Sequence, residues 1–417
     1  MKTGLRRDLK LLAAVGVGLG AIIGAGIFVV TGVAAGVAGP AFLVGLLLAG
    51  IVATFNALSS AQLAAAYPQS GGTYEYGYQV LHPWLGFAAG WMFLASKLAA
   101  GGTVALGFAG YLSTLIPGIP ERPFAIAAVL LLTLINYIGI QKTGFINTAI
   151  VSISVLSLVI FVLAGVPTFS PENFFPFAPT GIYGILQSAA LLFFAYTGYA
   201  RLATLGEEVR NPRKTIPRAI LMALGIAIIL YSAVATIALG NIGANGMAAS
   251  RSPIESAAGV FRWSQATRVV VVGATTAMLG VLLSQILGIS RMIFAMARRG
   301  DLPKSLSHVH PVHAIPDYGI LLTSAVMLVV VLFGTLEMIL ATAAFTILLY
   351  YSITNLAALR MRLEDRLYPS WVSVFGLVSC VILAATLQPI IIASGIGLLI
   401  VGFLLRWLFR QINSRAE

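Results

Sequence analysis

The segment from Gly20 to Val30, with the sequence GAIIGAGIFVV, most constrains how this chain can fold. It lies inside an apolar stretch from Leu11 to Ala35 that is long enough to cross a bilayer. Each glycine weakens a helix interior by about 1 kcal/mol, and three of them fall close together here. An opening at that depth requires other partners for the freed backbone groups, because lipid offers none. The pattern therefore predicts a broken membrane helix, which in transporters marks a binding site.

The composition predicts a polytopic membrane protein. Of the 417 residues, 59% are hydrophobic and only 9% are charged, whereas a soluble domain carries about 25% charged residues. The net charge of +12 would suggest a nucleic-acid partner in a soluble protein. In a membrane protein the basic residues concentrate in loops on one side, so we expect no nucleic-acid partner. The single cysteine, Cys380, lies in an apolar segment and cannot form an intramolecular disulfide.

Twelve segments of the chain have the length and apolar character of membrane spans. They cover residues 11–35, 41–66, 84–116, 123–140, 145–166, 181–208, 217–240, 265–297, 319–334, 337–361, 371–386 and 388–410. If the N-terminus is cytoplasmic, most Lys and Arg residues fall on the cytoplasmic side, which agrees with the positive-inside rule. We therefore expect a multi-pass protein of the inner or plasma membrane, with both termini cytoplasmic.

The sixth predicted span contains a second interruption, where AYTGY at Ala195 to Tyr199 separates an apolar half from a more polar half. The first and sixth spans begin on opposite sides of the membrane and both are broken. This correspondence is typical of an inverted-topology repeat.

The directions of the two broken helices predict the chemistry of a site between them. After the first break, the amides of Gly26, Ile27 and Phe28 would face the site at the positive end of a half-helix, where a carboxylate binds. Before the second break, the carbonyls of Phe194, Ala195 and Tyr196 would suit an ammonium group. Together they fit a zwitterionic amino acid. Alternatively, the glycines only allow helices to pack closely, as in small-xxx-small motifs.

Two basic residues fall within the predicted spans. Lys97 lies about 20 Å along the third span at 1.5 Å per residue, and intramembrane ionisable residues are functional candidates by default. Lys97 either carries a proton, or extends along a cavity or bonds to carbonyls. Arg201 either binds the substrate carboxylate or pairs with Glu207 or Glu208 as part of a cytoplasmic gate, and the gate is favoured.

Other polar residues give weaker signals. Ser154 and Ser284 could supply oxygen ligands to sodium, but a serine in a helix more often bonds to its own backbone. No Asp or Glu lies at the centre of a span, which argues against a cationic substrate and against an acidic proton relay. No nucleophile–base pair and no phosphate-binding loop occurs, so we expect neither an enzyme nor a bound cofactor or metal.

Four sequence blocks resemble the amino acid–polyamine–organocation superfamily, specifically bacterial amino acid permeases close to the cationic amino acid transporter group. They are GAIIGAGIF at Gly20 to Phe28, YPQSGGTYEYGY at Tyr67 to Tyr78, GEEVRNPRKTIPRAI at Gly206 to Ile220, and RMIFAMARRGDLP at Arg291 to Pro303. The resemblance implies a leucine-transporter-like fold, in which helices 1–5 and 6–10 form a 5+5 inverted repeat. It also implies alternating access around a site between helices 1, 3, 6, 8 and 10.

The chain departs from its relatives at two positions. Many relatives carry an acidic or small residue just after the sixth-helix aromatic residue, whereas here Ala200 is followed by Arg201. Some proton-coupled relatives place a lysine in helix five, where sodium-coupled relatives bind a cation. Ser154 stands there in this chain, so that coupling role does not carry over.

The sequence as a whole predicts an all-α amino acid permease with twelve transmembrane helices. Residues 1–361 would form the transport core, whose repeats divide near 167–180, and residues 362–417 would form peripheral helices 11 and 12 with a cytoplasmic tail. Neutral amino acids are the expected substrates, with proton coupling or exchange preferred over sodium. A sensor without net transport, or a transporter of cationic or anionic amino acids, is the alternative. The predicted substrate-binding residues are Ile23, Gly24, Ala25, Gly26, Ile27, Phe194, Ala195, Tyr196 and Gly198, and the coupling or gating candidates are Lys97, Ser154, Arg201 and Ser284.

Overall fold

The computed structural model describes residues 10–67, 71–116, 118–138, 144–203, 209, 211–313 and 315–415. Most of these residues lie in helices, and no β-strand occurs within these ranges. Eight helical runs in the described chain are long and apolar enough to cross a membrane. The protein is therefore an all-helical, multi-pass membrane protein, as the composition predicts.

The principal helices follow the predicted spans closely. In chain order they are α1 (Leu11–Ile22), α2 (Thr31–Ala38), α3 (Phe42–Ala66), α4 (Thr73–Tyr76), α5 (Pro83–Ser113), α6 (Glu121–Tyr137), α7 (Gly144–Gly165), α8 (Gly181–Tyr196), α9 (Ala200–Ala203), α10 (Pro212–Ala249), α11 (Pro253–Ala258), α12 (Ala266–Arg298), α13 (Asp317–Phe333), α14 (Leu336–Arg360), α15 (Ser370–Ala385) and α16 (Pro389–Arg415).

Some helices differ in length from the predicted spans. The α10 helix extends beyond the predicted 217–240, and its backbone kinks at Gly243, where φ is 67°. The apolar helices α13 and α15 have 17 and 16 residues, fewer than the roughly 20 that span the hydrocarbon core. The count of twelve spans and the inverted repeat therefore stay predictions.

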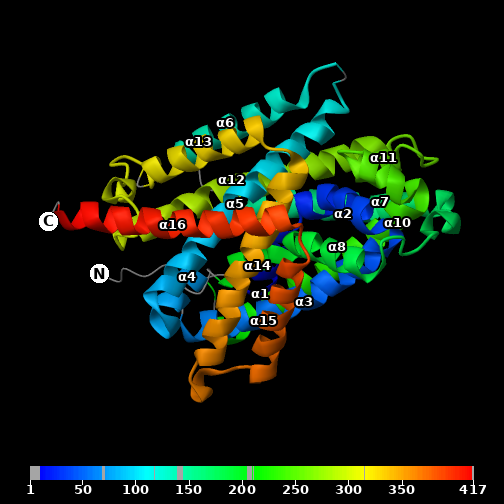
Figure 1. Ribbon diagram of the computed structural model, residues 1–417. Coiled ribbons are helices and arrows are strands. Elements are labelled where there is room, and N and C mark those ends of the chain that lie inside the picture. The colour runs from blue at the N-terminus through cyan, green and yellow to red at the C-terminus, as the bar shows by residue number, and fades with distance from the viewer. Residues whose placement is uncertain are drawn as a thin grey trace.

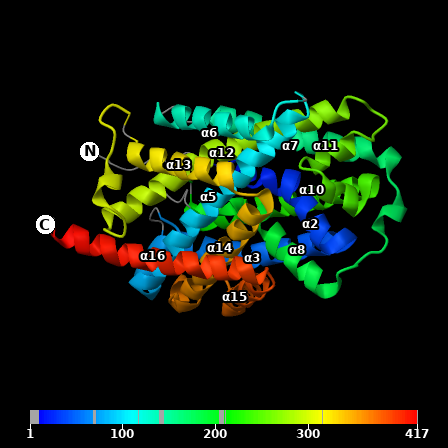
Figure 2. The same ribbon diagram turned by 45° about the horizontal axis from the view of Figure 1, so that its top comes forward.

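The helices pack into one bundle in which α5 contacts both α12 and α14. On one side, α6 and α13 lie side by side (Figures 1 and 2). The C-terminal α16 runs along the outside of the bundle, where it contacts α5 and α14 (Figure 1). This arrangement surrounds the first and sixth predicted spans with other helices, which supply the contacts that an interrupted helix needs in a membrane.

The first predicted span is broken within its glycine-rich stretch. The α1 helix ends at Ile22, and Ile23 takes an extended conformation with φ −74° and ψ 112°. A π-helical turn, η1 (Gly26–Val30), then leads directly into α2. Ala25 is already helical, with φ −53° and ψ −21°, so the break covers Ile23 and Gly24.

The sixth predicted span is interrupted by a helical turn and not by an extended segment. The α8 helix continues to Tyr196, and a single 3₁₀ turn, η6 (Thr197–Tyr199), connects it to α9. The turn falls on three of the five residues where the sequence predicts the interruption. A 3₁₀ turn keeps most backbone groups bonded within the chain, so this interruption frees fewer groups than an extended segment would.

Candidate functional site

The two interrupted helices contact each other through glycines. A Cβ atom added to Gly26 would lie 2.5 Å from the Cα atom of Ala195 in α8. One added to Gly198 would lie 2.2 Å from the carbonyl oxygen of Ala21 in α1. Only glycine fits at either position. Close helix packing, the alternative that the sequence left open, thus occurs here and brings both interruptions to one place.

Two adjoining cavities lie at this contact. The larger has a volume of about 380 Å³, within the range of small-molecule sites. The smaller has a volume of about 30 Å³, enough for a group slightly larger than one water molecule. Both cavities are lined by Ala21, Lys97, Thr197, Gly198, Val281 and Gln285.

Most of the predicted substrate-binding residues line the smaller cavity. They are Gly24, Ala25 and Gly26 at the first break, with Phe194, Ala195 and Gly198 at the second. Ile23, Ile27 and Tyr196 are buried but line neither cavity. The hydroxyl of Tyr196 instead donates to the carbonyl of Leu46, at 3.4 Å.

The four coupling or gating candidates separate into different environments. Lys97 lines both cavities, whereas Arg201 and Ser284 line only the larger one. Ser154 lines neither and is buried between helices, where its hydroxyl donates to Ile150 at 2.8 Å. The Ser284 hydroxyl donates to Gly280 at 3.0 Å. Both serines therefore bond to their own helices. The predicted partners of Arg201, Glu207 and Glu208, lie outside the described residues.

Some backbone groups that the sequence predicts to be available to a ligand have partners within the protein. The N–H of Phe28 donates to the carbonyl of Gly24, at 3.5 Å. The carbonyl of Phe194 accepts from the Thr197 N–H and from the Thr197 hydroxyl, the latter at 3.0 Å. The interruptions therefore offer a ligand fewer backbone groups than their directions alone suggest.

Tyrosines from neighbouring helices satisfy other carbonyls around the first break. The Tyr231 hydroxyl, in α10, donates to the carbonyl of Ile22 at 2.9 Å. The Tyr111 hydroxyl, in α5, donates to the carbonyl of Phe28 at 2.6 Å. These bonds supply the hydrogen-bond donors that lipid cannot offer to backbone carbonyls. Sequence reasoning missed both tyrosines, because they lie far from the break along the chain.

Two polar side chains that line both cavities lack hydrogen-bond or ion-pair partners among the described residues. Among the described residues, Lys97 makes no hydrogen bond or ion pair, and its Nζ atom lies 5.8 Å from the centre of the Phe93 ring. The Oε1 atom of Gln285 is buried and accepts no hydrogen bond. No Asp or Glu of the described chain lines either cavity. No sequence pattern marked Gln285, which directly follows the candidate Ser284.

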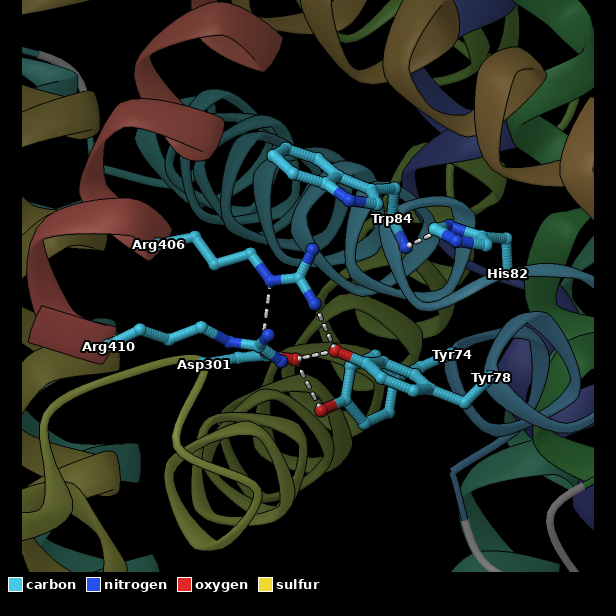
Figure 3. Close-up of polar contacts among 7 residues, drawn as sticks. All are labelled: Tyr74, Tyr78, His82, Trp84, Asp301, Arg406 and Arg410. Carbon is cyan, nitrogen blue, oxygen red and sulfur yellow. Dashed lines mark hydrogen bonds and ion pairs between the residues drawn. The ribbon is translucent and has the colours of Figure 1, made fainter. Parts of the chain in front are cut away.

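A second polar cluster surrounds the fully buried carboxylate of Asp301 (Figure 3). One carboxylate oxygen accepts from Arg406 at 2.9 Å and from Arg410 at 3.1 Å, both in α16. The other accepts from the Tyr74 hydroxyl at 2.9 Å and from the Tyr78 hydroxyl. We call these five residues the Asp301 cluster. Because its members come from distant parts of the chain, the cluster fixes α12, α16 and the segment before α5 to one another.

Aromatic rings and a further ion pair support this cluster. The Arg406 guanidinium lies over Trp84 and Phe87, with 5.2 and 4.9 Å to the ring centres. Arg299 pairs with Glu75 at 2.6 Å. Burial, together with the bond to Asp301, raises the pKa of Tyr78 to about 12, so its hydroxyl remains a donor at neutral pH. The cluster joins two of the sequence blocks quoted above, those ending at Tyr78 and Pro303.

Comparisons with known proteins agree with this architecture. A model of the amino acid permease family matches residues 14–411. An uncharacterized transporter of Mycobacterium tuberculosis is 40% identical over 415 residues, which cover 99% of this chain and 93% of the relative. The branched-chain amino acid permease BcaP of Bacillus subtilis is 32% identical, over 75% of this chain and 71% of the relative. The methylthioribose transporter of the same organism is 33% identical, over 76% of this chain and 72% of the relative.

Proposed function

Because this chain belongs to the amino acid permease family, we propose that it carries neutral amino acids across a membrane by alternating access. The observation that carries the proposal is the contact between two interrupted helices beside a cavity of about 380 Å³. Small-molecule sites have this size and combine apolar walls with a few polar groups. Interrupted helices that meet in this way are typical of the substrate sites of secondary transporters.

The lining of the larger cavity supports a neutral substrate. Its walls include Val17, Val281 and Ile289, and no acidic side chain of the described chain lines it. A cationic substrate would have to enter without a carboxylate partner, which is costly in a membrane interior. The relative BcaP is named for branched-chain amino acids, and such side chains would suit apolar walls.

Anionic amino acids are the second candidate substrates. Lys97 and Arg201 both line the larger cavity, and a substrate with an extra carboxylate would complement their positive charge. The methylthioribose transporter among the relatives adds an uncharged sugar to the compounds worth testing. Uptake measurements with these compounds distinguish the candidates directly.

The coupling that we propose is to protons or to exchange rather than to sodium. A sodium site needs several oxygen ligands around the ion. The hydroxyls of Ser154 and Ser284 each donate to a carbonyl of their own helix, and Ser154 lines neither cavity. These observations favour the helix-bonding interpretation of both serines.

The membrane arrangement that we propose has twelve spans, both termini in the cytoplasm and a 5+5 inverted repeat. The distribution of Lys and Arg along the sequence supports this orientation. In this orientation, the larger cavity would lie on the cytoplasmic side of the first break, because Val17, Gly20 and Ala21 line it from α1. The protein would then be in an inward-facing state.

The proposal is tested by uptake into proteoliposomes that contain the full-length protein. Radiolabelled neutral, acidic and basic amino acids, and methylthioribose, are offered with and without an inward proton gradient, in the absence of sodium. Gradient-driven accumulation of neutral amino acids supports proton coupling, and uptake only into amino acid-loaded vesicles supports exchange. Binding without any uptake would favour a sensor, and neither binding nor uptake of any amino acid would overturn the proposal.

A further inference from the structure

Lys97 and Gln285 are placed to contact any molecule that fills both cavities. Each lines the larger and the smaller cavity, and they come from different helices, α5 and α12. Gln285 Oε1 lies 3.4 Å from the position that a Cβ atom of Gly101 would occupy. Gly101 is four residues beyond Lys97 and therefore about 6 Å further along α5. The two polar groups thus lie near successive turns of one helix.

These two side chains can add to the backbone groups that the interruptions offer. The Phe28 amide and the Phe194 carbonyl, which the sequence assigns to substrate carboxylate and ammonium, are bonded within the protein. Lys97 is a cation without an ionic partner among the described residues, and Gln285 Oε1 is an acceptor without a donor. One carries the charge that attracts a carboxylate, and the other offers the lone pairs that an ammonium group needs.

The volumes of the cavities fit a division of the substrate between them. The smaller cavity, of about 30 Å³, accommodates a group of a few atoms but not the side chain of a branched-chain amino acid. The larger cavity, of about 380 Å³, has mostly apolar walls. A neutral amino acid carries two small polar groups, a carboxylate and an ammonium, and a larger apolar side chain on one carbon atom.

Building on the function proposed above, we propose that Lys97 binds the α-carboxylate of the transported amino acid. Gln285 Oε1 accepts a hydrogen bond from its α-ammonium group, and the side chain occupies the larger cavity. Lys97 is then a substrate-binding residue and not a proton carrier. This assignment explains how a cation persists inside the membrane without an acidic partner, because the substrate supplies one in each transport cycle.

The test compares an amino acid with analogues that lack one charged group. Counterflow uptake of a radiolabelled substrate into proteoliposomes is inhibited by the unlabelled amino acid, by its amide and by its α-hydroxy acid. The amide has no carboxylate, and the hydroxy acid has no ammonium group. In the wild type, both analogues should inhibit at least tenfold more weakly than the amino acid, a difference of about 1.4 kcal/mol or more.

Substitutions then assign each difference to one side chain. Lys97→Met should weaken inhibition by the amino acid at least tenfold and inhibition by the amide less than twofold, and Lys97→Arg should restore part of the difference. Gln285→Leu should reduce the discrimination against the hydroxy acid. Lys214→Met is the matched control, because Lys214 is exposed at the start of α10 and lines neither cavity.

Three outcomes would overturn this assignment, and each differs from failure of the proposed function. One is a wild type that transports amino acids but is inhibited by the amide as strongly as by the amino acid. Another is a Lys97→Met variant that keeps full discrimination and loses only gradient-driven accumulation, which would make Lys97 a proton carrier. The third is a Lys97→Met variant in which inhibition by the amino acid and inhibition by the amide are weakened equally. If Lys97→Met does not fold, the wild-type analogue series and Lys97→Arg still decide the question. A wild type without any amino acid uptake would instead count against the proposed function.

Discussion

The backbone of Gly26 lies directly against the backbone of Ala195, so that a Cβ atom on Gly26 would approach the Ala195 Cα atom to 2.5 Å. This contact joins the interruption after α1 to the end of α8. A methyl group cannot be accommodated by rotating a side chain there, because the opposing atoms are the Cα and Cβ atoms of Ala195, which no side-chain rotation moves. Replacing Gly26 by any larger residue would therefore force the two interruptions apart.

We expect Gly26→Ala and Gly198→Ala each to reduce transport by more than tenfold. The added methyl group must push α1 and α8 apart, and overpacking of this kind costs about 1–3 kcal/mol of unfolding free energy. Initial uptake rates in proteoliposomes at matched protein density measure the effect. Gly16→Ala in α1 is the control, since nothing lies within 4 Å of its added Cβ atom. Normal transport by both cavity-side variants would contradict the importance of the contact.

We expect Tyr231→Phe to destabilise the break after α1. The substitution removes the hydroxyl that donates to Ile22 at 2.9 Å, and an unsatisfied buried carbonyl costs about 1–3 kcal/mol. Thermal unfolding in detergent should show a lower midpoint for this variant. Tyr183→Phe serves as a control because Tyr183 is 54% exposed. An unchanged midpoint for Tyr231→Phe would mean that this bond contributes nothing to stability.

We expect the Asp301 cluster to be far more sensitive than an exposed ion pair. Arg406→Gln leaves part of the charge of a fully buried carboxylate uncompensated, and breaking a buried pair costs about 3–5 kcal/mol. The matched control is Arg362→Gln, whose pair with Glu364 spans 3.6 Å with both side chains largely exposed; exposed pairs contribute about 0–1 kcal/mol.

Thermal unfolding of both arginine variants measures this difference. Asp301→Asn combined with Arg406→Gln should lose less stability than the sum of the single variants, because the two groups interact. Strict additivity of the two losses would show that Asp301 and Arg406 are not energetically coupled.

We expect Ser154→Ala to leave uptake within twofold of the wild type in both sodium and potassium media. The Ser154 hydroxyl donates to Ile150 at 2.8 Å, and the residue lines neither cavity. Initial uptake rates with matched salt concentrations provide the measurement. Wild-type uptake that requires sodium and disappears in Ser154→Ala would instead restore the sodium-site hypothesis.

Local sequence was sufficient to predict the all-helical membrane architecture and the broken first span. Glycines weaken a helix at their own positions in the chain, so the break at Ile23 and Gly24 follows from the residues of that segment. The position of Lys97 deep in the membrane was also predictable, because its depth in the third span follows from helix geometry.

Features that depend on distant residues were not predictable from the sequence in this way. Tyr231 lies 209 residues from the carbonyl that it satisfies, and nothing in its own neighbourhood marks it. Gln285 becomes a candidate only when its Oε1 atom is found buried without a donor beside a cavity. The Phe194 carbonyl differs from expectation for a local reason, because Thr197 supplies two donors to it.

The Asp301 cluster also has a consequence for how the protein is made. Arg406 follows Asp301 by 105 residues, so the ribosome completes α12 long before the cationic partners of this carboxylate exist. Until α16 is synthesised and docks, the nascent protein carries an acidic group without its two arginines in a site that the finished protein buries completely. A chain truncated before residue 406 would therefore lack both arginines that neutralise this carboxylate.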